Sequence, residues 1–204
     1  STSSQYNLKE TDFNPTFSFR EKENNRRYRF MELIEEYDKI DYDDFKKIKY
    51  DQKYPDSIAF IGNINEIFSI DFKNEEVADI HNLIINWDRE GDYNNLGAAQ
   101  WSIFYNNTLK ILKKNNIEVT DSIPHIYFLE GLKTAKKYLV KNFGKVDILL
   151  GDLQRHIRGE LSLPVSGLID MIAPTYVSKY KGGTYRSVSG ESYIMLVKYS
   201  KSNI

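Results

Sequence analysis

The sequence predicts an α+β fold in which a mainly helical region is followed by a strand-rich region. Apolar residues recur at helical spacing between residues 24 and 144. After Gly144, short apolar or alternating runs are separated by Gly, Pro and Ser. Because the two patterns occupy separate parts of the chain, the order is that of a segregated α+β protein. We therefore expect an extended lead-in over residues 1–23, helices over 24–144 and strands over 145–204.

Composition limits the classes of partner. The chain has 204 residues, of which 41% are hydrophobic and 28% charged, as in ordinary folded proteins. Its 28 Lys and Arg nearly balance its 29 Asp and Glu, so the positive excess that binds a phosphate backbone is absent. No apolar run approaches the ~20 residues that span a bilayer. We expect neither nucleic acid nor a membrane span. The lack of cysteine excludes disulfides and thiolate chemistry.

Two helices are predicted in the first part of the helical region. The first follows Asn24 or Asn25 as its cap, and its apolar face consists of Phe30, Leu33, Ile34 and Tyr37. Asp41 and Asp44 form an acidic variant of the capping box before the second helix. The segment 54–56, which contains a proline, is expected to end that helix.

Three longer helices are predicted next. One begins after Asn74 and carries an apolar stripe formed by Val77, Ile80, Ile84 and Trp87. Another covers about 96–111, and a third runs from Pro124 to Phe143, with Gly144 placed to end it. The strand-rich region is predicted to form strands at 146–150, 161–165, 183–188 and 193–199.

Local catalytic patterns are weak. Ser178 and Lys181 match the Ser/Lys pair of β-lactamase-type acyl transfer, but they precede a Gly-Gly turn, so we interpret them as a solvated loop. Ser192 follows Gly190-Glu191, yet the closing glycine of a nucleophile elbow is missing. The acidic residues of 88–92 lack calcium-loop spacing and indicate a capping turn.

The histidines His81, His125 and His156 are far apart in the sequence and match no metal-binding signature, so no metal site is predicted. His156 has charged neighbours, namely Asp152, Arg155, Arg158 and Glu160. It is a candidate for proton transfer, and a surface ion network is the alternative interpretation.

Several segments together resemble the penicillin acylase family, in particular its acyl-homoserine-lactone and aculeacin acylase branch. Their order and spacing carry the resemblance. The segments are Glu23-Asn24-Asn25-Arg26, Ile48-Lys49-Tyr50-Asp51, Trp87-Asp88-x-x-Gly91-Asp92 with Gly97-Ala98-Ala99, Gly151-Asp152-Leu153-Gln154-Arg155 with Arg158-Gly159, Leu163-Pro164-Val165-Ser166-Gly167 and Gly190-Glu191-Ser192-Tyr193-Ile194-Met195-Leu196-Val197.

The resemblance implies an amide hydrolase with an N-terminal Ser nucleophile, an αββα sandwich, a periplasmic or extracytoplasmic location and no cofactor. The motif order places this chain inside the β subunit, so we expect it to hold no catalytic residue and to be inactive alone. Ser1 does not match the nucleophile, because the polar sequence Thr-Ser-Ser-Gln-Tyr-Asn follows it. The expected partners are the rest of the β subunit, the α subunit and a small N-acyl substrate.

One functional residue is carried over by the resemblance. Arg26 occupies the place of an Arg at the start of a helix near the active site, where its planar guanidinium could orient the oxyanion Asn or a substrate carboxylate. A helix-start Arg in a surface ion pair is the alternative. Pro15 stands where some relatives have a calcium ligand, which leaves calcium binding by the intact protein an open question. A helical interaction or scaffold module without catalysis is the alternative function.

Overall fold

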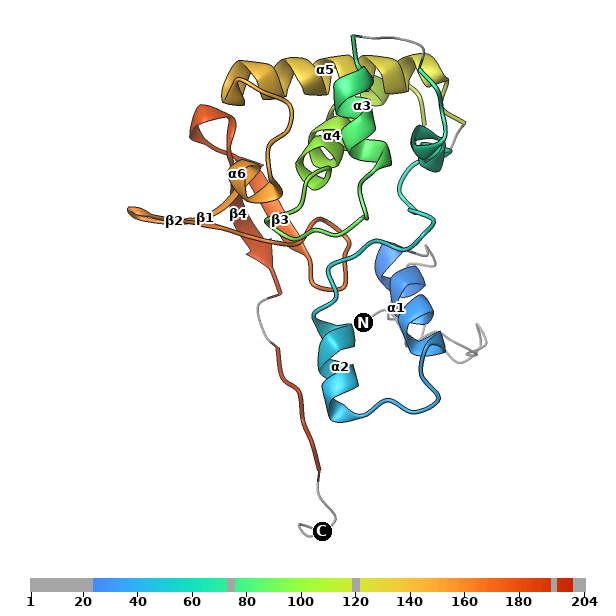
Figure 1. The fold of residues 1–204 in the computed structure, drawn as a ribbon, viewed down its shortest axis with the longest axis vertical. Coiled ribbons are helices and arrows are strands. Elements are labelled where there is room, and N and C mark those ends of the chain that lie inside the picture. The colour runs from blue at the N-terminus through green and yellow to red at the C-terminus, as the bar shows by residue number, and fades with distance from the viewer. Residues whose placement is uncertain (1–23, 73–75, 119–121, 192–193, 200–204) are drawn as a thin grey trace.

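The computed structural model describes residues 24–72, 76–118, 122–191 and 194–199 and has an α+β fold, as predicted (Figure 1). The predicted lead-in 1–23, including Ser1 and Pro15, lies outside the described residues. The helices are α1 (Asn25–Glu35), α2 (Tyr42–Lys49), η2 (Ile64–Phe68), α3 (Ala78–Ile85), α4 (Ala98–Lys114), α5 (His125–Phe143), α6 (Leu150–Leu153) and η3 (Lys181–Gly183). The strands are β1 (Gln154–Arg158), β2 (Leu161–Pro164), β3 (Thr175–Lys179) and β4 (Tyr185–Gly190).

The helix starts follow local capping chemistry. The Asn24 side chain accepts a hydrogen bond from the Arg27 backbone N–H and begins α1. Asp41 and Asp44 form the predicted capping box of α2. That helix already ends at Lys49, several residues before the predicted stop at 54–56. Pro124 precedes α5, and Gly144 ends it in the left-handed conformation, both as predicted.

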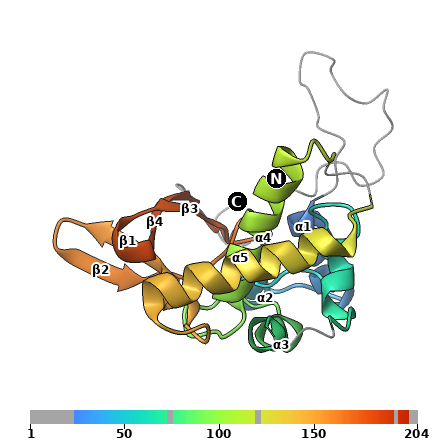
Figure 2. The ribbon, with the colours of Figure 1, turned by 90° about the horizontal axis from the view of Figure 1, so that it is seen from above.

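The core lies where α3, α4 and α5 pack together, and Figure 2 shows α5 crossing over α4 with the sheet to one side. Large rings fill it, with Tyr54, Trp101, Phe104 and Phe128 almost fully buried. The predicted stripe of α3 is buried at all four positions. Gly97, at φ +94°, allows α4 to begin against α3, because a Cβ there would lie 2.5 Å from the Trp87 Cβ. None of the described helices is long and apolar enough to cross a bilayer.

The four strands form one mixed sheet in the order β2-β1-β4-β3. β1 and β2 form an antiparallel hairpin in which Arg158 lies opposite Leu161. β4 runs parallel to β1, with Gln154 beside Tyr185, and antiparallel to β3. β1 and β4 are neighbours in the sheet, although β2 and β3 lie between them in the sequence. The sheet therefore brings residues from distant segments side by side.

The strand predictions were only partly correct. β2 confirms the strand predicted at 161–165, and β4 lies two residues later than predicted. The predicted strand at 146–150 is wrong: α6 begins at Leu150, and the Gln100 side chain donates to the backbone oxygens of Val146 and Ile148. A continuous apolar run does not separate a strand from other buried structure. Residues 194–199 form no strand, and 193 lies outside the described residues. β1 and β3 were missed because their residues are largely polar.

Candidate functional site

The N-terminus of α1 is tied to the loop before β3 by Asn25. This residue is completely buried, and its backbone N–H and its side-chain amide both donate to Asp170 Oδ2 at 3.0 Å. The backbone N–H of Ala59 donates to Asn25 Oδ1 at 2.7 Å. Asp170 has a φ of +58°, a left-handed conformation that costs roughly 1–2 kcal/mol for a residue other than glycine. The contacts to Asn25 therefore hold a strained aspartate in place.

Arg26 lies beside this aspartate. Its Nε is 3.6 Å from Asp170 Oδ1, and its Nη2 donates to the hydroxyl of Tyr176 on β3 at 2.7 Å. The Arg26 side chain is 28% exposed, so solvent or a ligand reaches part of the guanidinium. Its Nε is buried and makes no hydrogen bond among the described residues. We call Asn25, Arg26, Asp170 and Tyr176 the α1 junction.

Other segments of the family-like motifs support the α1 junction. Arg29 makes a bidentate pair with Asp51, through Nε at 3.1 Å and Nη2 at 3.0 Å. Burial opposes the charge of Arg29, but the hydrogen bonds and charges of Asp51 and Glu32 together outweigh it and raise the pKa of Arg29. The backbone N–H of Gly91 donates to Gln52 O, and that of Gly167 donates to Gly91 O, each at 2.7 Å. Motif segments that are far apart in the sequence are therefore joined in pairs.

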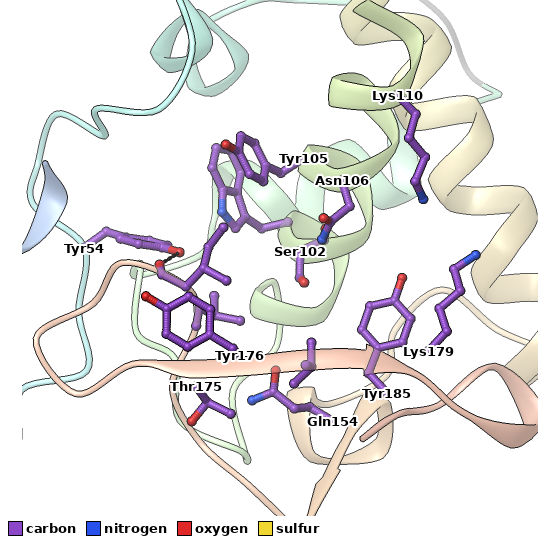
Figure 3. Close-up of a pocket in the computed structure, with 14 residues that line it drawn as sticks. Tyr54, Ser102, Tyr105, Asn106, Lys110, Gln154, Thr175, Tyr176, Lys179 and Tyr185 are labelled. Carbon is purple, nitrogen blue, oxygen red and sulfur yellow. Dashed lines mark hydrogen bonds between the residues drawn. The ribbon is translucent and has the colours of Figure 1, made fainter. Parts of the chain in front are cut away.

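A cavity of about 210 Å³ lies next to the α1 junction, between α4 and the sheet (Figure 3). Tyr176 connects the two, because it lines the cavity and also accepts the hydrogen bond from Arg26. Figure 3 places an aromatic group at one end of the cavity, formed by Tyr54, Tyr105 and Tyr176. Burial, together with the charge of Asp170, raises the pKa of Tyr105 to about 12. The Tyr105 phenol is therefore a neutral hydrogen-bonding group at physiological pH.

The opposite end of the cavity is cationic. Lys110 from α4 and Lys179 from β3 lie there beside the hydroxyl of Tyr185 (Figure 3). Burial and the charge of Lys179 both lower the pKa of Lys110. Burial raises the pKa of Tyr185, so this hydroxyl stays protonated. No Asp or Glu is among the described residues that line the cavity.

The histidines do not come together. His81 is buried, and its Nε2 lies 2.9 Å from the backbone oxygen of Ile67, which indicates a structural role. His125 pairs with Glu66 at the surface, while His156 lies on β1 in a shallow depression beside Arg158. Within the described ranges, no group of three or more His, Cys, Asp or Glu could hold a metal ion.

The remaining candidates from the sequence are placed as follows. Ser178 is exposed on β3 and Lys181 lies in the short turn η3, so the helical Ser/Lys arrangement of a β-lactamase is not formed. Asp88 accepts hydrogen bonds from the Glu90 backbone N–H and from the Asn95 side chain, as in a capping turn. Ser192 lies outside the residues that the structure describes.

Of the α1 junction, the sequence marked Asn25 as a candidate helix cap, and it marked Arg26 as a functional residue through the family resemblance. Asp170 and Tyr176 lie 145 and 150 residues away from their partners in α1, and no local pattern marks them. No family model matches the chain, and a search of curated proteins also finds no match. The function must therefore be inferred from the motifs and from the way they meet in the fold.

Proposed function

We propose that the chain is part of a penicillin-acylase-like amide hydrolase, in which it supports the active site and does not supply the nucleophile. Contacts between motif segments that are far apart in the sequence carry this proposal: Lys49 pairs with Glu191, and the backbone N–H of Gly167 donates to Gly91 O. Asn25 and Arg26 reach Asp170 across 145 and 144 residues, and the Arg29–Asp51 pair braces the same helix.

Arg26 is the residue through which this chain would act. A guanidinium carries five N–H donors in one plane. Asp170 and Tyr176 hold two sides of that plane, which fixes its orientation at the start of α1. The partly exposed remainder can orient a carboxamide or carboxylate beside an acyl-enzyme centre. Cleavage of a small N-acyl substrate would proceed through an N-terminal Ser ester, with the α-amino group of that Ser as base.

The same proposal names the partners as the rest of the β subunit and the α subunit, in an extracytoplasmic αββα sandwich. Exposed apolar side chains on the sheet support it. Leu161 and Leu163 on β2 are 51% and 48% exposed, and Val188 on β4 is 54% exposed. β2 is an outer strand of the described sheet, and an outer strand with apolar side chains is a site where further strands pair.

The test uses the complete natural gene product. We expect it to cleave itself and to release fatty acid from an N-acyl amine, whereas the 204-residue chain alone has no activity. Arg26→Gln is expected to lower kcat/KM by about 100-fold through misplacement of the reacting groups. Arg26→Lys should recover only part of this loss, because a lysine lacks the planar fork.

Arg186→Gln is the matched control, since this arginine is exposed on β4 outside the α1 junction. We expect this control to retain activity, and the melting temperatures of all variants to stay close to that of the unaltered enzyme. An uncleaved, inert product would overturn the proposal and favour the scaffold function. Full activity of Arg26→Gln would remove the role assigned to Arg26.

A further inference from the structure

Lys110 and Lys179 converge on one end of the cavity without an acidic partner. They come from different elements, α4 and β3, and Figure 3 shows both side chains beside the hydroxyl of Tyr185. Lys179 Nζ lies 5.5 Å from the centre of the Tyr138 ring, a cation–π contact. Among the described residues, neither lysine makes a salt bridge. The cationic end therefore has two ammonium groups and a phenol but no anion.

This arrangement has an electrostatic cost that an anion would relieve. Both lysines are exposed, but partial desolvation of Lys110 and the positive charge of Lys179 together disfavour the protonated form of Lys110. A carboxylate between the two ammonium groups would accept charge-assisted hydrogen bonds from both. The Tyr185 hydroxyl, at the same end, is a further donor to such a group.

The rest of the cavity is suited to a small apolar body. Beyond the lysines it is lined by the rings of Trp101 and Tyr105 and by the aliphatic side chains of Leu168 and Val177. Ser102, Asn106, Gln154 and Thr175 also line it. The Gln154 amide donates to the backbone oxygens of Val165 and Gly167, the Asn106 amide to that of Ser102 and the Thr175 hydroxyl to that of Ser166. A cavity of roughly 150 Å³ accommodates benzene. The volume of about 210 Å³ thus leaves room for one ring and a carboxylate.

We propose that this cavity is a binding site for a small organic carboxylate, with the carboxylate between Lys110 and Lys179 and its apolar body against Trp101 and Leu168. The site does not depend on the proposed amide hydrolysis, because its residues all belong to this chain. Failure of either proposal leaves the other in place.

The experiment is a calorimetric titration of the 204-residue chain with benzoate, its neutral isostere benzamide, and inorganic phosphate. We expect benzoate to bind with a dissociation constant on the order of 1 mM or lower. Benzamide should bind at least about 10-fold more weakly, because it lacks the charge that the lysines recognise. Phosphate should also bind at least about 10-fold more weakly, because it gains nothing from the apolar wall.

Lys110→Gln and Lys179→Gln should each weaken benzoate binding by about 10-fold or more. Lys113→Gln is the matched control, since Lys113 is exposed on the same helix and does not line the cavity. Melting curves of the three variants show whether each is folded. Equal affinity for benzoate and benzamide, equal affinity for benzoate and phosphate, no saturation with benzoate, or an equal loss in Lys113→Gln would each overturn the proposal.

Discussion

Replacing Asn25 with Ala removes the side chain that ties α1 to the rest of the protein. The variant leaves the Ala59 N–H without its acceptor and deprives Asp170 of one of its donors. A buried N–H without a partner costs about 1–3 kcal/mol, and a hydrogen bond to a charged group contributes about 1.5–3 kcal/mol. The contribution of the hydrogen bond to Asp170 is smaller here, because the Asp170 side chain is 25% exposed and keeps the Asn25 backbone N–H as a donor. Alanine is the better helix former by about 0.6 kcal/mol.

The net expectation is a loss of about 3 kcal/mol in the free energy of unfolding, measured by urea denaturation. Asn24→Ala is the neighbouring comparison, because it removes one part-buried capping hydrogen bond from the same helix. That variant should lose only about 1 kcal/mol. If Asn25→Ala costs no more than Asn24→Ala at an unchanged m-value, the buried contacts to Ala59 and Asp170 do not hold the α1 junction.

Two further predictions concern the backbone and the buried phenols. Gly97→Ala should prevent stable folding, since the new Cβ would lie 2.7 Å from the Leu83 backbone oxygen; Gly144→Ala, with open space around it, should lose only about 1–2 kcal/mol. Soluble yield and melting temperature compare the two, and an equally stable pair would contradict the close packing. Burial raises the pKa of Tyr105 to about 12. The resulting contribution to the free energy of unfolding is fully present below pH ~10 and falls progressively as the pH rises to about 12. Urea denaturation at each pH should show Tyr105→Phe losing less stability over this range than the unaltered chain; identical losses would refute the assignment to Tyr105.

Helix positions could be predicted from the sequence because their signals act within a few residues. Asn24, the Asp41–Asp44 box and Gly144 each satisfy or end a neighbouring turn, whatever the rest of the chain does. The strands were predicted less well for the opposite reason. β1 and β3 contain mainly polar residues and are stabilised by pairing with β2 and β4.

The sequence by itself determined the α+β class, the helical half and, through the motifs, the choice of Arg26. Only the tertiary structure decided which residues lie next to Arg26. Asp170 and Tyr176 reach Arg26 because the loop before β3 returns to α1, and Lys110 and Lys179 line one cavity because α4 and β3 lie on opposite sides of it. Such pairs are joined by packing between segments that are distant in the chain. The spacing of residues within one segment does not depend on its contact with a distant segment, so no local pattern could have predicted that contact.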